Sequence, residues 1–208
     1  MDDLARDTVP EYYSKNPIIS GLFKRRLSLA FELGQLEGKE PLDVLDLGCG
    51  TGLLLGMFLK DYPQHRYSGW DVHPGIDDLR PKMPAVDFKR LDFRDPAQLP
   101  AKTFDRVFCL DVLEHFENLE PVLVSLRRLL KPDGLFVISE PTESWLYQLG
   151  RLASKGTTST VDGPTGTPHY YNAAGVHAVM LKAGFKCREL RKTPPWPIDL
   201  FHVTAYGL

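Results

Sequence analysis

Short apolar runs recur along the chain, and most of them end at Gly, Pro or Asp. Runs of this length that are rich in branched and aromatic residues are typical of β-strands buried in a sheet. Strands are therefore predicted for PLDVLDL, YSGWD, VDFKRLD, FDRVFCL and GLFVISE. Two further segments near the end of the chain, FKCRELR and LFHVTAYGL, are also strand-like.

Helical periodicity separates several of these strands. One helix is predicted over residues 52–60, and a second runs through NLEPVLVSLRRLLK, where apolar residues recur at helical spacing from Leu119 to Leu129. We expect this second helix to end at the turn formed by Pro132, Asp133 and Gly134. Strands that alternate with helices in this way imply right-handed crossovers and a mostly parallel sheet.

Other helices are predicted on both sides of this alternating region. Asn16 can cap a helix before the first strand, and Pro17 suits its first turn. The basic run Lys24–Arg26 in that helix is interpreted as a solvated face. Later helices are predicted in ESWLYQLGRLASKG and NAAGVHAVMLKAG, with a long Gly-, Thr- and Pro-rich loop between them.

This organisation favours one domain over residues 1–208. Residues 1–38 are expected to form an N-terminal helical cap, and residues 141–171 a helix plus a lid-like loop. The composition, 43% hydrophobic and 25% charged, is that of an ordinary globular protein. The formal net charge of −2 provides no overall positive field for nucleic acid. Three scattered cysteines, no signal peptide and no membrane-spanning run favour a cytoplasmic setting.

The segment VLDLGCGTG places Gly48, Gly50 and Gly52 directly after the first predicted strand. A dinucleotide fingerprint would need glycine where Leu53 stands, and no Walker A string exists, so a phosphate is a poor ligand here. Glycine allows positive φ and a close approach to the main chain, and the next helix begins with N–H groups that favour a carboxylate. The carboxylate of Asp46, at the end of the strand, can form an ion pair with an ammonium group. The pattern therefore predicts a site for an amino acid moiety.

Further acidic residues follow the later strands. Asp71 ends the second strand, where a carboxylate can accept hydrogen bonds from both ribose hydroxyls. Asp92 can accept the exocyclic amine of adenine and Phe93 can lie against the base, although the two can also be a turn acid and a core aromatic. Asp111 is expected to face the amino acid end of the ligand or to cap the next helix. One ligand that combines a ribose, an adenine and an amino acid is S-adenosylmethionine.

With these motifs the chain resembles the class I S-adenosylmethionine-dependent methyltransferases, and more narrowly the small-molecule group that includes the ubiquinone and menaquinone biosynthesis enzymes. The resemblance covers roughly residues 40–190 and includes FDRVFCLDVLEHF and LLKPDGLFVISEP. It implies a three-layer, Rossmann-like α/β fold with a seven-stranded, mostly parallel sheet of order 3-2-1-4-5-7-6 and an antiparallel last strand. It also implies an enzyme that transfers a methyl group from S-adenosylmethionine to O, N or C of a small molecule, with S-adenosylhomocysteine as product.

The resemblance also indicates where the methyl acceptor approaches. His115 and His169 are the candidates for acceptor contact or general base, because imidazole titrates near neutrality. Tyr170 or Tyr171 is predicted to form the aromatic wall of the acceptor pocket, and Tyr12 and Tyr13 to close its other side. The remaining histidines are interpreted as structural or surface residues: His65, His73, His177 and His202.

No metal is expected, since the sequence has no H-E-x-x-H string and no cysteine pair, although Asp111, Glu114 and His115 leave a weak magnesium site open. Two alternatives to the small-molecule enzyme remain: a protein or nucleic-acid methyltransferase, and a non-catalytic S-adenosylmethionine-binding subunit. Peripheral membrane contact is a further alternative, through an apolar stripe on the helix in ESWLYQLGRLASKG. The acceptor, the pathway and the oligomeric state are not identified by the sequence.

Overall fold

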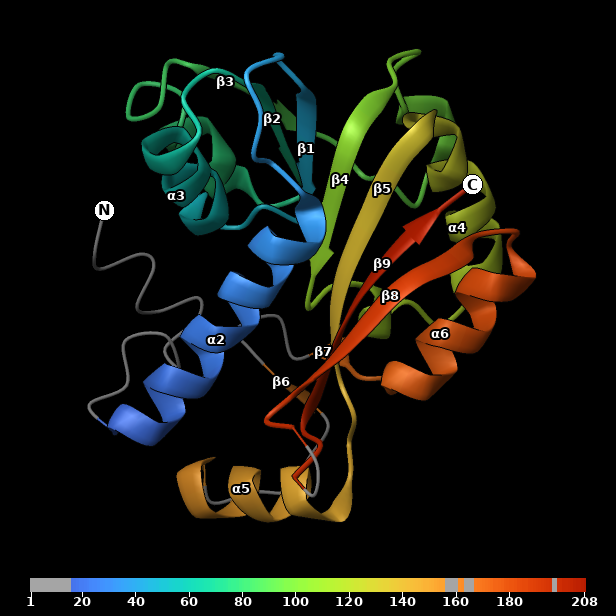
Figure 1. Cartoon of the computed structure of the whole chain (residues 1–208). Helices are drawn as coiled ribbons and strands as arrows, with labels where there is room; N and C mark the ends of the chain where they lie inside the picture. The colour runs from blue at the N-terminus through green and yellow to red at the C-terminus, as the bar shows by residue number, and fades with distance from the viewer. Residues whose placement is uncertain (1–15, 156–160, 163–166, 196–197) are drawn as a thin grey trace.

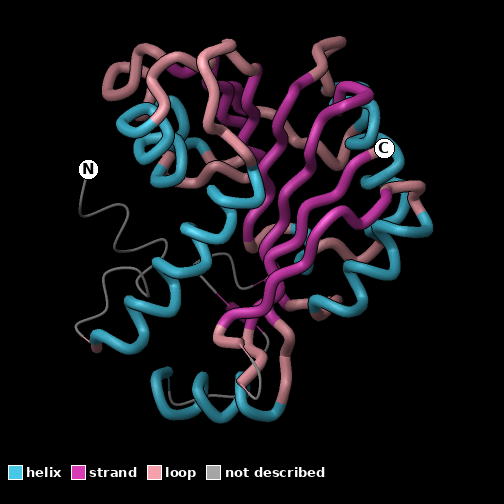
Figure 2. Tube along the Cα trace, viewed as in Figure 1, coloured by secondary structure: helices cyan, strands magenta, loops and turns pink. Residues whose placement is uncertain are grey.

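The computed structural model describes residues 16–155, 161–162, 167–195 and 198–208. Its centre is a seven-stranded sheet with the order β3-β2-β1-β4-β5-β9-β8 (Figures 1 and 2). These strands are β1 (Asp43–Leu47), β2 (Arg66–Asp71), β3 (Val86–Arg90), β4 (Phe104–Leu110), β5 (Leu130–Pro141), β8 (Lys186–Thr193) and β9 (Phe201–Gly207). A separate two-stranded pairing joins β6 (Val161–Asp162) to β7 (Thr167–Pro168).

The strand directions confirm the fold class expected from the sequence. Strands β1 to β5 are parallel to one another, whereas β9 is antiparallel to both β5 and β8. The predicted order 3-2-1-4-5-7-6 is therefore observed, with LFHVTAYGL supplying the antiparallel strand. Because parallel strands end at the same edge, their carboxyl ends gather the residues that follow β1, β2, β3, β4 and β5 on one side of the sheet.

Helices cover both faces of the sheet (Figure 1). They are α2 (Pro17–Gly34), α3 (Leu53–Asp61), α4 (Leu119–Leu126) and α6 (Ala173–Lys182), whereas α5 (Trp145–Lys155) lies beyond the end of the sheet. Val44 and Phe108 pack in the core that includes residues of α2 and α3, while their strand neighbours Leu45 and Val107 pack in the core that includes α4 and α6. This alternation follows from the two-residue period of a strand, which turns successive side chains to opposite faces.

The largest difference from the predicted helix boundaries is at the end of α4. The helix expected to end at the turn of residues 132–134 ends at Leu126, a short 3₁₀ turn, Arg127–Leu129, follows it, and residues 132–134 lie inside β5 instead of forming a turn. The reason is that Leu130 already pairs with Phe104 of β4, so the backbone is extended there. At the start of α2 the predicted cap is confirmed, since the side chain of Asn16 accepts a 3.0 Å hydrogen bond from the N–H of Ile18.

Candidate active site

The loop between β1 and α3 is built on glycine. Gly48, Gly50 and Gly52 all have positive φ, at 73°, 49° and 72°. The N–H of Gly48 donates to the carbonyl of Trp70 at 2.8 Å, which fixes the loop against β2. A Cβ atom placed on Gly50 would meet none of the described residues within 4 Å, so this part of the structure leaves the main chain there uncovered. Gly52 caps α3 without any side-chain bond, and the first N–H groups of that helix remain available to a ligand.

Asp46 and Asp71 flank this loop. Asp46 lies near the end of β1 and is 4% exposed, and its carboxylate has no hydrogen-bond partner among the described residues. Burial, together with the nearby charge of Asp71, raises the pKa of Asp46 to about 8. Asp71, at the end of β2, accepts 2.8 Å hydrogen bonds from the N–H groups of Gly50 and His73. Each carboxylate oxygen has two acceptor positions, so Asp71 retains acceptor capacity for a ligand.

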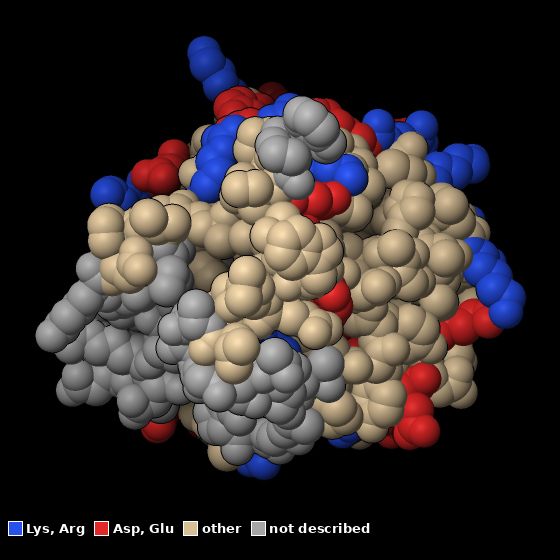
Figure 3. Space-filling view, turned by 90° about the horizontal axis from the view of Figure 1, so that it is seen from below, with Lys and Arg blue, Asp and Glu red and all other residues tan. Residues whose placement is uncertain are grey.

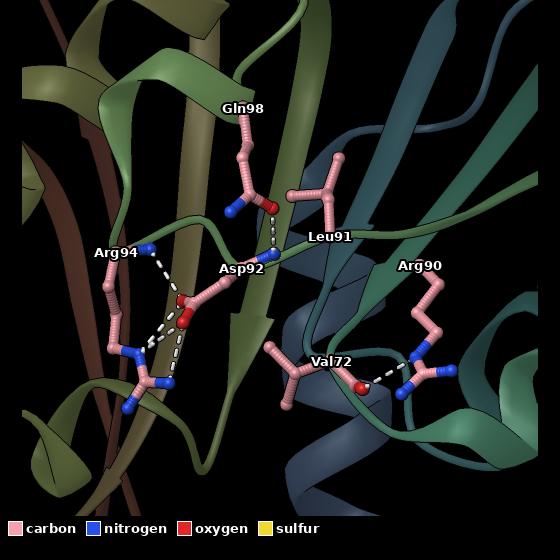
Figure 4. Close-up of a pocket in the computed structure, with 6 residues that line it drawn as sticks. All are labelled: Val72, Arg90, Leu91, Asp92, Arg94 and Gln98. Atoms are coloured by element: carbon pink, nitrogen blue, oxygen red, sulfur yellow. Dashed lines mark hydrogen bonds and ion pairs between the residues drawn. The ribbon is translucent and has the colours of Figure 1, made fainter.

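A pocket of about 300 Å³ opens beside the ends of β2 and β3 (Figure 4). It is lined by Val72, Arg90, Leu91, Asp92, Arg94 and Gln98. Asp92 lies in this lining, and its carboxylate accepts hydrogen bonds from Nε and Nη2 of Arg94 at 2.6 to 3.0 Å, which lower the pKa of Asp92. Phe93 points elsewhere: it is 5% exposed and packs in the core, 5.6 Å from the ring of Phe116. Of the two interpretations left open for Phe93, the geometry supports the core aromatic.

Asp111 follows β4 in the left-handed region, with φ of 57°. Its carboxylate pairs with the guanidinium of Arg26, which also donates to Ser139 Oγ at 3.2 Å. Arg26 is 2% exposed and lies between the rings of Phe23 and Phe201, at 4.9 and 4.1 Å from their centroids. The prediction that Arg26 belongs to a solvated face is therefore wrong. The available signal was its helical spacing from apolar residues of α2, which places it on the buried face.

His115 and His169 come together although they lie far apart in the sequence. Their ring centroids are 4.8 Å apart, and His115 Nδ1 lies 3.3 Å from the carbonyl oxygen of Pro168. His169 Nδ1 lies 2.7 Å from Glu143 Oε1, and both of these side chains are largely buried. Glu143 was not among the predicted residues, and only the structure brings it to His169. Like Asp111, Glu143 has positive φ, at 51°, a strained state that occurs preferentially at functional sites.

Two carboxyl groups lie buried beside these residues. Glu114 and Glu140 are each 1% exposed, and Glu140 follows Ser139 on β5. Burial, followed by the charge of Asp111, raises the pKa of Glu114 to about 7, whereas burial and the charge of Glu114 raise the pKa of Glu140 well above its usual range. With Asp46 and Asp111 nearby, the carboxyl edge of the sheet concentrates acidic groups that a cationic ligand would stabilise in the charged form.

The remaining predicted residues take different places. Tyr170 is 48% exposed, and its N–H donates to the carbonyl of Glu114 at 2.7 Å. Tyr12 and Tyr13 lie outside the described residues. The other histidines hold bonds within the structure: His65 with Leu36 and Leu42, His73 with Gly75, His177 with Tyr206, and His202 with Asp199.

Comparison with known sequences places the chain in a family. The profile described as "Methyltransferase domain" matches residues 20–190. Among curated relatives, the chain is 31% identical over 119 residues to a malonyl-[acyl-carrier protein] O-methyltransferase of Acetivibrio thermocellus, which covers 56% of this chain and 41% of the relative. It is 24% identical to a sterol 24-C-methyltransferase of Schizosaccharomyces pombe, over 86% of this chain and 48% of the relative.

The fold is also that of solved methyltransferase structures. An N-methyltransferase, NodS, from Bradyrhizobium japonicum in complex with S-adenosyl-L-homocysteine superposes with a TM-score of 0.66 at 15% identity, covering 95% of this chain and 94% of that one. The chain spans about half the length of the curated relatives it matches. Because the family profile covers most of the sequence, this chain belongs to the methyltransferase domain family, and the family resemblance seen in its motifs is confirmed.

Proposed function

We propose that this chain transfers a methyl group from S-adenosylmethionine to a small-molecule acceptor. The observation that carries the proposal is the glycine loop of positive φ with Asp46 and Asp71 on either side of it. The curated relatives named above act on malonyl-[acyl-carrier protein] and on a sterol, and neither substrate is assigned to this chain.

The residues present fit S-adenosylmethionine. The open face of Gly50 leaves room for a ligand against the main chain, and the start of α3 suits the carboxylate of its amino acid part. Asp46 would hold the ammonium group, Asp71 the ribose, and the pocket around Asp92 the adenine. The cofactor supplies an electrophilic methyl group on a sulfonium, which an aligned nucleophile displaces directly. Alignment of the two reactants alone can lower the barrier by about 7–11 kcal/mol.

We propose that the acceptor lies beside His115 and His169. The bond from Glu143 to His169 Nδ1 fixes the ring and favours a proton on that nitrogen, which leaves the lone pair of Nε2 for the acceptor's proton. Asp111, held by Arg26, would border the methionine end of the cofactor. Tyr170, with its half-exposed ring, would form an outer wall of the pocket.

A small-molecule acceptor is favoured over nucleic acid by the surface charge. In Figure 3, Lys and Arg lie mainly at the margins of the part of the face drawn in colour, with Asp and Glu interspersed among them. Nucleic-acid binding relies on a basic patch or stripe that contacts phosphates.

We also propose that residues 1–208 act as one domain, with residues 1–38 as a cap and residues 141–171 as a helix plus lid; most of that lid loop lies outside the described residues.

Peripheral membrane contact and a cytoplasmic setting stay predictions. Within the described parts of the chain, no helix combines the length and apolarity required to cross a bilayer. Helix α5 exposes Trp145, Leu149 and Leu152 at 73%, 53% and 46%, in keeping with the predicted apolar stripe. We expect sedimentation with lipid vesicles to fall when Trp145 and Leu149 are both replaced by Ser, and equal sedimentation of the two proteins would contradict membrane contact.

Calorimetry with S-adenosylhomocysteine, followed by a methyl-transfer screen over small hydroxy, amino and acidic acceptors, tests the proposed function. Binding followed by turnover of at least one acceptor is expected. Binding without turnover of any acceptor, protein or nucleic acid would favour the non-catalytic subunit. Absence of binding at millimolar ligand would contradict the proposal.

Replacing Asp71 by alanine is expected to weaken S-adenosylmethionine binding by about 1–3 kcal/mol, because the ribose hydroxyls lose their acceptor. Calorimetry measures the change, and thermal unfolding checks that the loop, which also bonds to Asp71, remains folded. Asp87→Ala, on the exposed face of β3, is the matched control and should bind as the wild type does. Unchanged affinity in Asp71→Ala would show that the ribose lies elsewhere.

Alanine at Gly50 and at Gly48 should have different effects. At Gly50 the added methyl group enters open space, so we expect weaker cofactor binding with a loss of unfolding free energy of only about 1 kcal/mol from the positive φ. At Gly48 the Cβ would lie 2.4 Å from Cγ2 of Val112, so the fold itself should lose about 2–3 kcal/mol. Urea unfolding and calorimetry separate the two effects, and equal destabilisation by both variants would count against this account of the loop.

A further inference from the structure

Glu114, His115 and His169 form a compact group beside the proposed acceptor position. Glu114 and His115 lie in the 3₁₀ turn Leu113–His115 after β4, and His169 follows β7. The N–H of Tyr170 donates to the carbonyl of Glu114, which joins the two segments. One nitrogen or oxygen atom from each of the three side chains lies within 4.8 Å of the other two. To surround one cation, the three atoms would have to move closer together by rotation about the side-chain bonds.

The surroundings of the two histidines are those of metal ligands. Histidines that bind a metal through one nitrogen almost always donate the other N–H to a carboxylate or a backbone carbonyl, which fixes the tautomer and the ring orientation. His169 has Glu143 at 2.7 Å from Nδ1, and His115 has the carbonyl of Pro168 at 3.3 Å from Nδ1. In this tautomer the lone pair of each ring is on Nε2.

A second and independent observation concerns the carboxylates. Glu114 is 1% exposed, and its Oε2 has no hydrogen-bond partner within the described part of the chain; Glu143 Oε2 is buried in the same condition. A buried carboxylate oxygen without a donor is costly, and such atoms commonly mark an ion or a ligand. A cation held by Glu114 would offset that cost.

We propose that Glu114, His115 and His169 bind one divalent first-row transition cation. Two imidazoles and one carboxylate suit Zn²⁺, Co²⁺ or Fe²⁺ better than Mg²⁺, which prefers oxygen ligands throughout. Three protein ligands leave at least one coordination position open, as in catalytic rather than structural sites. From the sequence, no metal was expected. The fold changes this expectation into a proposal, because it brings His169, which is distant in sequence, to Glu114.

This proposal relies on the proposed function only for the position of the acceptor. The open coordination position would then take an oxygen of the acceptor, which selects compounds with a hydroxyl or carboxylate group. A cation lowers the pKa of a bound hydroxyl, so that the proton can leave to solvent without a base. His169 Nε2 cannot bind the cation and accept the acceptor's proton at the same time. With the cation bound, the metal and not His169 would promote loss of that proton.

Titration of untagged, chelator-treated full-length chain with CoCl₂ and ZnCl₂ tests the proposal without any cofactor present. Calorimetry is expected to give one cation per chain, and Co²⁺ to develop the visible absorption of a low-coordinate site. His169→Ala and Glu114→Gln should each weaken binding at least tenfold, and Glu143→Gln roughly 10–100-fold through the orientation of His169. His202→Ala is the matched control, since His202 also pairs with a carboxylate, that of Asp199 at 3.0 Å, but lies outside the group.

The outcomes separate this proposal from the function. If neither cation binds at a one-to-one ratio, or if His169→Ala and Glu114→Gln bind Co²⁺ as tightly as the wild type, the metal site is wrong even when S-adenosylhomocysteine binds normally. Circular dichroism melting of each variant identifies any that fail to fold. In that case His115→Gln, which keeps a polar side chain of similar reach, replaces the unfolded variant and is expected to show the same loss.

Discussion

Asp46→Asn is expected to weaken S-adenosylmethionine binding by about 2–5 kcal/mol while making the ligand-free chain more stable. The carboxyl group is 4% exposed, and burial beside Asp71 raises its pKa to about 8 from an ordinary value of 3.8. At neutral pH the folded chain must therefore hold a proton on Asp46 that the unfolded chain releases. Asparagine keeps the shape without this cost, but it cannot supply the charge that the ammonium group of the ligand requires.

The gain in stability from Asp46→Asn depends on pH. Because the pKa of Asp46 is higher in the folded than in the unfolded chain, its contribution to stability falls as pH rises from about 4 to about 8 and then levels off. The difference in unfolding free energy between variant and wild type should be absent near the lower limit and reach about 5 kcal/mol near the upper one. Urea unfolding of both proteins across this range measures it.

Asp43 provides a control of opposite sign on the same strand. Hydrogen bonds and ion pairs with Arg66 and Lys131 lower its pKa to about 2. Asp43→Asn should therefore destabilise the chain at neutral pH by about 1–2 kcal/mol, and this loss should disappear as pH falls through 2.

Loss of stability in Asp46→Asn at pH 8, or unchanged cofactor affinity, would contradict the assignment of Asp46 to the ammonium group.

His169→Ala is expected to lower kcat roughly 10²–10⁴-fold and to leave the affinity for S-adenosylhomocysteine nearly unchanged. The imidazole lies at the proposed acceptor position, and Glu143 holds it from the side opposite Nε2. Its loss removes the group that receives the proton, or that holds the proposed cation, but none of the residues assigned to the cofactor. Single-turnover methyl transfer to the acceptor identified in the screen measures the chemical step directly.

Two further variants locate this effect. Glu143→Gln keeps an oxygen that can accept from Nδ1 but removes the charge, so its kcat should fall less than that of His169→Ala. His202→Ala removes a histidine that pairs with Asp199 and not with Glu143 or His115, and it should retain wild-type kcat. A His169→Ala enzyme that turns over at the wild-type rate would place the acceptor elsewhere along the sheet edge.

The local sequence pattern predicted the central strands well because both faces of β1 and β4 are largely buried, which gives each of them a short apolar run. Val44 and Leu45 show this directly, as neighbours in the sequence that enter cores on opposite sides of the sheet. The loop after β1 was also predictable, since three glycines in five residues constrain the backbone whatever surrounds them. By contrast, the end of α4 depends on the pairing of Leu130 with Phe104, which is a long-range contact.

The side chains that complete the site were harder to predict for the same reason. Arginine usually lies on the protein surface. Arg26 is buried because the rings of Phe23 and Phe201 pack on its guanidinium and Asp111 pairs with its charge. Glu143 is relevant to the site because it contacts His169, which lies in another part of the chain. Phe93 was left between two interpretations because a sequence does not show on which side of a turn an aromatic ring will lie.

The position of β9 between β5 and β8 has a consequence for how the sheet is assembled. Strand β8 precedes β9 in the chain, yet β9 is its only partner among the described strands, so β8 has no neighbour in this sheet until β9 is in place. During synthesis, the edges of β5 and β8 that later pair with β9 therefore stay unpaired until β9, which lies between them in the sheet, has been made. Exposed edges of this kind template association between chains. Nascent copies of this protein should accordingly be most vulnerable to aggregation just before β9 emerges, and shielding by a chaperone would matter most at that stage.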